Sequence, residues 1–291
     1  MHPRLHVLLA AVCFGTTGTA QALGPAASPV AVGAARIVLG GALLVAVARA
    51  MGVRRPRVDA TVAGIAVAVA VYQLSFFAAV RLTGVAVGTV VAIGTGPAAA
   101  GLLGRLVNGE RLTRRWALAT LCGAAGVVLL AGDGGATVEL SGLALAVTAG
   151  AGYATCTVLS KRLIARGAAP EGVMAAGFGG AAVLLVPVLA IAGPGFLTGA
   201  AGIALALYLA AIPTALAYVL FSRGLRALSS GETATLVLAE PLTAAALGIL
   251  ALGEQPSAAA AAGAALVLGG LAILAAPVGR RPPVEPALAT A

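Results

Sequence analysis

Two ionisable residues stand inside long apolar stretches of the sequence. Glu240 precedes Pro241 in one stretch, and Arg36 lies in another. A charge inside a lipid bilayer costs a few kcal/mol, so such residues are candidate elements of ion or substrate pathways. Glu240 either binds a cationic group or carries a proton for exchange, or it has a structural role. Arg36 attracts a substrate carboxylate, or its side chain extends outward to the membrane surface, or it ties loops and carbonyl groups together. Both are therefore candidate coupling groups.

Uncharged polar side chains also interrupt the apolar stretches. Because lipid offers them no hydrogen bonds, they face either a wet cavity or a neighbouring helix. The tyrosines have a further alternative, which is a place in the aromatic belt at the membrane surface. The predicted cavity-lining residues are Thr16, Thr17, Gln21, Tyr72, Gln73, Thr95, Tyr153, Tyr218 and Glu240.

Two prolines, Pro97 and Pro241, also lie inside apolar stretches. A proline within a helix lacks the amide hydrogen and frees a carbonyl group one turn earlier, so it kinks the helix. Each proline is either a hinge for rocking between two states or a static kink.

The sequence lacks the residues that catalysis or cofactor binding requires. Both histidines, His2 and His6, stand at the start of the chain, and no H-E-x-x-H or G-x-x-x-x-G-K-[ST] motif occurs. Cys13, Cys122 and Cys156 lack the spacing of metal ligands and are interpreted as packing residues. We therefore predict no enzyme activity, no metal site and no cofactor.

The composition is that of a membrane protein. Of the 291 residues, 60% are hydrophobic and only 9% are charged, which is too few to cover a soluble domain. Nucleic-acid binding is not expected despite the net charge of +9, because the basic residues form short clusters between apolar stretches. A span needs about 20 apolar residues. Ten helices are predicted, at 5–23, 30–48, 61–80, 85–107, 116–131, 140–159, 173–191, 203–220, 234–252 and 258–276.

The charges between these helices alternate along the chain, which predicts the orientation. Basic residues concentrate in cytoplasmic loops of membrane proteins. The sequence therefore predicts a multi-pass protein of the cell (inner or plasma) membrane with both termini in the cytoplasm. The outer loops would hold Asp133, Glu139, Glu254 and, as their only basic residue, Arg81. The cytoplasmic loops and tail would hold Arg49, Arg54, Arg55, Arg57, Arg111, Arg114, Arg115, Lys161, Arg162, Arg166, Arg223, Arg226, Arg280 and Arg281.

The two halves of the chain resemble each other. One offset aligns Pro97 with Pro241, and Gly109-Glu110 with Gly253-Glu254. Five helices per half is an odd number, so the second half must enter the membrane upside down. The predicted fold is therefore an all-α polytopic membrane protein with ten transmembrane helices in two inverted five-helix repeats. The predicted domains are 1–135 and 136–278, followed by a disordered cytoplasmic tail at 279–291.

In the order and spacing of its motifs the chain resembles the EamA-type family of the drug/metabolite transporter superfamily. The segments that carry the resemblance are 14–19, 35–36, 97–113, 153–162, 214–218 and 240–254. The resemblance implies a central cavity lined by the first, third, fourth, sixth, eighth and ninth helices. It also implies that the fifth and tenth helices are peripheral.

Inverted repeats and the resemblance together predict a secondary transporter that works by alternating access. The resemblance implies an exporter of small metabolites, such as amino acids, related compounds or drugs. The expected partners are a small-molecule substrate, the lipid bilayer and, for a coupled carrier, protons, in a monomer or homodimer. A flippase for lipids or lipid-linked sugars is an alternative, and a membrane-embedded enzyme is a weaker one.

Overall fold

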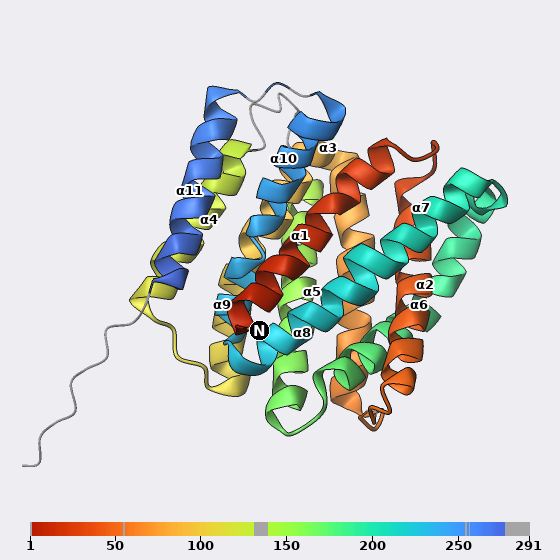
Figure 1. Ribbon diagram of the computed structural model, residues 1–291, viewed down its shortest axis with the longest axis horizontal. Coiled ribbons are helices and arrows are strands. Elements are labelled where there is room, and N and C mark those ends of the chain that lie inside the picture. Colours follow the sequence, from red (N-terminus) through yellow and green to blue (C-terminus); the bar gives the residue numbers. More distant parts are fainter. Residues whose placement is uncertain (1, 55, 131–138, 254, 256, 277–291) are drawn as a thin grey trace, which may run out of the picture.

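The structure, a computed structural model, describes residues 2–54, 56–130, 139–253, 255 and 257–276. These residues form an all-helical bundle (Figure 1). The helices are α1 Pro3–Ala22, α2 Pro29–Ala50, α3 Ala60–Asn108, α4 Arg114–Leu130, α5 Leu140–Ala165, α6 Pro170–Ala192, η1 Pro194–Thr198, α7 Ala200–Ala210, η2 Ala211–Leu216, α8 Ala217–Ala227, α9 Ser230–Leu236, α10 Ala239–Leu252 and α11 Ala258–Ala275. The predicted tail, Arg55, Asp133 and Glu254 lie outside the described residues.

The helical segments have the dimensions of membrane spans. Within the described ranges, nine segments are both long and apolar enough to cross a bilayer. The tenth, α4, has 17 residues, slightly fewer than the ~20 that span the hydrocarbon core. The segments match the ten predicted apolar stretches. The expected polytopic all-α fold is therefore confirmed.

The described helices depart from regular α-helix at three places. The third and fourth helices form the continuous element α3, which kinks at Gly84, where φ is +81°. Only glycine adopts this backbone conformation without strain, so it makes the turn between the two spans. The eighth span runs through α7, the π-helical turn η2 and α8. The ninth span is split into α9 and α10 by a short turn at Val237 and Leu238.

The two halves run in opposite directions through the bundle. Arg4, near the start of α1, pairs with Glu232 on α9. Lys161, near the end of α5, donates to carbonyl groups at the end of α8, next to the start of α9. The first helix of one half therefore begins at the same end of the bundle where the first helix of the other half ends. This is the inverted arrangement that the odd helix number predicted.

Packing between helices also has the twofold pattern of a repeat. The second span, α2, packs on the seventh, α6, and the fifth, α4, packs on the tenth, α11. α3 and α5 pack extensively on each other, and we call them the first bundle. α1 packs on α8 and α10, and we call these three helices the second bundle together with α9, which belongs to the same span as α10 and also packs on α3. Figure 1 shows the second bundle in front of the first, between the α4–α11 pair and the α2–α6 pair.

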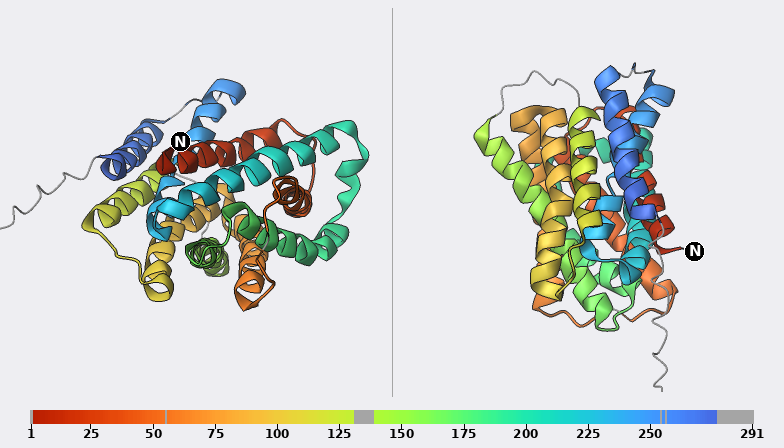
Figure 2. Two further views of the ribbon diagram at one scale, coloured as in Figure 1. Left: turned by 60° about the horizontal axis from the view of Figure 1, so that its bottom comes forward. Right: turned by 90° about the vertical axis from the view of Figure 1, so that its left-hand side faces the viewer.

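Basic side chains gather at one end of the bundle, where α1 begins, and we call this the basic end. It is the lower end in Figure 1, and the right-hand view of Figure 2 shows the same end from the side. Its described residues include Arg4, Arg49, Arg54, Arg57, Arg105, Arg111, Arg114, Arg115, Lys161, Arg162, Arg166, Arg223 and Arg226. The opposite end carries Arg81 and Glu139 near its helix ends.

Candidate functional site

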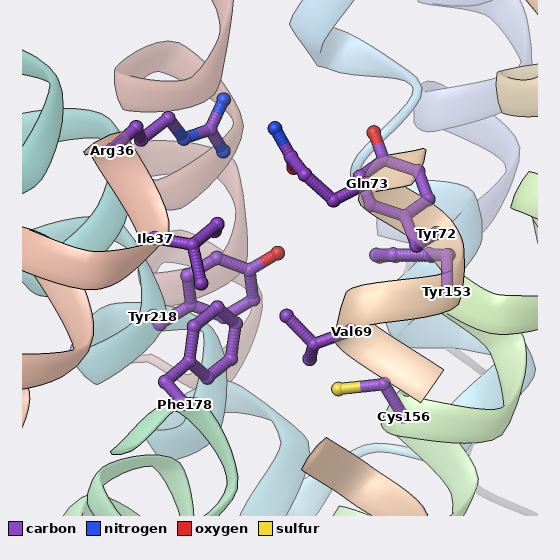
Figure 3. A pocket seen from close by; sticks show the side chains of 9 residues that line it. All are labelled: Arg36, Ile37, Val69, Tyr72, Gln73, Tyr153, Cys156, Phe178 and Tyr218. Atoms are coloured by element: carbon purple, nitrogen blue, oxygen red, sulfur yellow. The ribbon is translucent and has the colours of Figure 1, made fainter. Parts of the chain in front are cut away.

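A cavity lies between the bundles, near the middle of the helices. It holds about 290 Å³ of empty space, including the part open to solvent. Transporters of this architecture hold their substrates near the membrane midplane at the repeat interface. Figure 3 shows the side chains that line the cavity: Arg36, Ile37, Val69, Tyr72, Gln73, Tyr153, Cys156, Phe178 and Tyr218.

Aromatic rings form the wall of the cavity nearer the basic end. The ring centroid of Tyr218 lies 4.1 Å from that of Phe178 and 5.9 Å from that of Phe221. Phe14 of α1 and Tyr153 of α5 extend the cluster at centroid distances of 5.0 Å from Tyr218 and 6.3 Å from Phe221. Rings at such distances attract one another edge to face. The cluster joins helices from both bundles and provides an apolar surface for a solute.

Arg36 is held in position by the π-helical turn of the eighth span. Its Nε donates a 3.0 Å hydrogen bond to Oγ1 of Thr214. The Thr214 hydroxyl in turn donates to the carbonyl oxygen of Leu209, 2.7 Å away. In Figure 3 the Arg36 guanidinium points across the cavity toward the amide of Gln73. Within the part of the chain that the structure describes, Nε is the only nitrogen of the Arg36 side chain that forms a hydrogen bond. The two terminal nitrogens are therefore free to bind an anion.

Glu240 lies beside the cavity without being one of its lining residues. It stands in the first turn of α10, directly after the break in the ninth span. Its side chain is half-buried, and no residue in the described ranges forms a hydrogen bond or an ion pair with its carboxyl group. Arg36 and Tyr72 lie close enough to interact with it electrostatically. A carboxyl and a guanidinium group from opposite halves therefore flank the central cavity.

The structure places the predicted site residues in two groups. Tyr72, Gln73, Tyr153 and Tyr218 line the cavity, together with the predicted coupling residue Arg36. Thr16, Thr17, Gln21, Thr95 and Glu240 are not among its lining residues.

Two of the threonines use their hydroxyl groups within their own helices. Thr16 donates to the carbonyl oxygen of Cys13 at 2.8 Å, and Thr95 donates to that of Val91 at 2.7 Å. Thr95 also packs closely against Gly150 of α5. Such bonds satisfy a hydroxyl group in lipid without a wet cavity.

The two predicted hinges have different surroundings. Pro97 lies within α3, where Gly84 is the residue with a non-helical backbone. Pro241 follows the turn between α9 and α10.

Sequence reasoning missed four residues of the cavity: Ile37, Val69, Cys156 and Phe178. Cys156 lies three positions after Tyr153, and Val69 lies three before Tyr72, so helical spacing puts each pair on one face. That spacing could have revealed two of them, but no sequence signal distinguishes Phe178 from other apolar residues. The lining residues come from the second, third, sixth, seventh and eighth spans. The second and seventh spans thus line the cavity, although the family resemblance did not imply them. The first, fourth and ninth spans, which it did imply, contribute none of these lining residues.

Comparison with known proteins identifies the family. The model of the EamA-like transporter family matches the chain twice, at residues 4–132 and 140–276. The chain belongs to the EamA-like transporter family. It is 40% identical over 280 residues to the uncharacterized transporter YwfM of Bacillus subtilis (strain 168), covering 94% of this chain and 93% of that protein. One solved crystal structure is similar with a TM-score of 0.81 and 25% identity, covering 93% of this chain and 95% of that one. The family resemblance stated from the sequence is therefore confirmed, and a multi-pass transporter family implies a non-enzyme.

Proposed function

We propose that this member of the EamA-like family is a secondary transporter that exports small metabolites by alternating access. The observation that carries the proposal is the central cavity, which is lined by helices of both inverted repeats and combines Arg36 and Gln73 with an aromatic wall. An inverted repeat offers two equivalent arrangements, one open at each end, around a fixed midplane site. The absence of a nucleotide-binding motif favours an ion or solute gradient as the source of energy.

The charge distribution supports an orientation with the basic end in the cytoplasm. Arginine and lysine concentrate at the end where α1 begins and α11 ends, close to Arg4. The positive-inside rule then places the N-terminus and the end of α11 in the cytoplasm of a cell membrane.

The side chains around the cavity favour a small zwitterion, such as an amino acid or a related metabolite. The free nitrogens of Arg36 suit a carboxylate, and the carboxyl group of Glu240 suits an ammonium group or a proton. The rings of Tyr218 and Tyr153 suit an apolar side chain.

Metabolite profiling of cells and medium tests this function. Overexpression of the protein is expected to move at least one amino-acid-like solute from cells into medium. Arg36→Gln should strongly reduce this movement, whereas Arg49→Gln, which changes a charge at the basic end outside the cavity, should preserve it. If no solute differs between the two variants, or if purified protein in vesicles moves phospholipid instead of solute, the proposal is wrong.

A further inference from the structure

The basic end of the cavity is closed by contacts between the two bundles. The α8–α9 turn of the second bundle, at Leu228 and Ser229, fits between side chains of the first bundle. Glu110 approaches this turn from the loop after α3, and Lys161 approaches it from α5. Lys161 lies roughly two helical turns beyond Tyr153 of the cavity, toward the basic end. The contact therefore lies between the cavity and the basic surface.

Glu110 binds the start of α9 with both carboxyl oxygens. The backbone N–H of Ser230 donates to Oε2 and its hydroxyl group donates to Oε1, each at 2.8 Å. Ser230 is fully buried, so these bonds replace water that it cannot reach. The first N–H groups of a helix have no partner within the helix, which makes a carboxylate a suitable acceptor.

Gly104 provides the space for this carboxyl group. A Cβ atom at Gly104 would collide with Oε2 of Glu110 and would lie 3.3 Å from Cβ of Ser230. Any larger residue at this position of α3 would therefore push the carboxyl group away from α9. The approach of Glu110 to Ser230 depends on this glycine.

Lys161 makes the complementary contact with the end of α8. Its Nζ donates to the carbonyl oxygens of Leu225 at 2.9 Å and Arg226 at 3.2 Å. The last carbonyl groups of a helix lack partners within the helix, so an ammonium group satisfies them. Lys161 is also near enough to Glu110 for the two charges to attract each other. A carboxylate and an ammonium group thus bind the two sides of one turn.

We propose that Glu110 and Lys161 form a clasp on the α8–α9 turn that holds the basic end closed and must release when that end opens. This inference rests on the proposed alternating access. The first bundle lines one side of the cavity, and Tyr218 of the second bundle faces it from the other side beside residues of α2 and α6. Opening at the basic end therefore has to separate the two bundles there. The clasp joins the two bundles, whereas the Arg4–Glu232 ion pair at the same end joins α1 to α9 within the second bundle. Release of the clasp should therefore change the distance between bundles, and release of that ion pair should not.

Distance measurement between spin labels tests the clasp. Leu106→Cys on α3 and Ala227→Cys on α8 place labels at exposed positions on the two bundles, after replacement of the three native cysteines. In reconstituted protein, Glu110→Gln and Lys161→Gln are each expected to raise the ratio of long to short distances by about tenfold, the effect of weakening a charged hydrogen bond. Glu232→Gln, the matched control, is expected to leave the ratio unchanged.

Gly104→Ala provides a second route to the same result, because it displaces the Glu110 carboxyl group without removing a charge. It is expected to shift the ratio in the same direction as Glu110→Gln. The proposal is overturned if folded Glu110→Gln and Gly104→Ala proteins keep the parental distances. It is also overturned if Glu232→Gln shifts the distances as much as Glu110→Gln does.

The distances are measured without substrate, so the clasp and the transport proposal fail separately. Distances that respond only to the clasp variants support the clasp even where no exported solute is found. Export with unchanged distances in the clasp variants supports the proposed function and overturns the clasp.

Discussion

Pro97 and Pro241 occupy equivalent positions in the two repeats, but the helix is continuous around Pro97 and broken before Pro241. Pro97 lies in an uninterrupted part of α3. The residue before it, Gly96, faces Tyr153 so closely that a Cβ atom added to the glycine would lie 3.3 Å from the tyrosine ring. Pro241 follows a two-residue break, where the N–H of Glu240 donates to the carbonyl oxygen of Val237 at 2.8 Å. That carbonyl is the one that a proline at 241 leaves without its usual helical partner.

The difference shows that the repeat fixes the position of the proline but not the backbone conformation around it. In the first half, the position before the proline is a glycine that lets α3 approach α5. In the second half it is Glu240, a half-buried carboxyl group at the start of a helix segment. Discontinuous helices place polar groups in the middle of a membrane, where transporters bind ions and substrates. The proposed transport mechanism would therefore place ion coupling in the second repeat, whereas the equivalent position of the first repeat serves helix packing.

The largest expected effect is that of Glu240→Gln. Because the amide cannot carry a proton, uptake or efflux driven by a proton gradient should be abolished in vesicles. Exchange of labelled for unlabelled solute, which needs no gradient, should continue. Equal rates of gradient-driven transport in the variant and the parent would show that Glu240 is not the coupling group. Glu171→Gln at the basic end is the control for loss of a carboxylate.

Arg36→Gln should have the next largest effect. Loss of a charged hydrogen bond of about 1.5–3 kcal/mol predicts an affinity for carboxylated solutes that is lower by roughly 10- to 100-fold. Thr214→Val removes the hydroxyl group that positions Arg36 and should have a smaller effect, about fivefold, because it deletes one ordinary hydrogen bond. Binding measured by calorimetry on the purified protein checks both values. A larger loss in the Thr214 variant than in the Arg36 variant would contradict this order.

Substitution of the two prolines tests the comparison directly. Pro241→Ala should slow transport several-fold, because the restored N–H favours a continuous helix across the break. Pro97→Ala should leave the rate nearly unchanged and raise the midpoint of thermal unfolding, since it removes a helix-breaking residue from an uninterrupted segment. Transport rates and unfolding midpoints measured side by side provide the test. Equal slowing in both variants would mean that the two repeats flex alike.

The smallest expected effect concerns Cys156, which lines the cavity and is about 7% exposed. In a Cys13→Ala, Cys122→Ala background, a membrane-impermeant thiol reagent should label Cys156 slowly from the side opposite the basic end. The clasp on the α8–α9 turn should block labelling from the basic end. Faster labelling from the basic end would show that the cavity opens in the other direction.

Much of the fold could be predicted because lipid leaves few alternatives. The ten apolar stretches became helices at nearly the predicted positions, since a segment in a bilayer must satisfy its own backbone hydrogen bonds. The irregular parts were less predictable. The π-helical turn at η2 contains Pro213, which signals an irregularity without fixing its form. The break before Glu240 lies at Val237 and Leu238, which carry no turn signal.

The site was predictable in kind and less so in detail. Tyr72, Gln73, Tyr153 and Tyr218 stood out as polar residues in apolar helices, and all four line the cavity. Thr16 and Thr95 stood out for the same reason, but their hydroxyl groups bond to carbonyl groups of their own helices. Sequence cannot separate the two cases, because a threonine satisfied within its helix and one facing water have the same local signature.

The sequence by itself determined the membrane environment, the number of helices, the inverted repeat and the basic end, because hydropathy, an odd helix number and charge act along the chain without reference to partners. Only the tertiary structure decided which polar groups meet. Arg36 forms a hydrogen bond with Thr214, and Glu110 forms one with Ser230, although each pair is separated by more than a hundred residues of sequence. Those pairings arise from helix packing, where close approach and the direction of each side chain decide the partner.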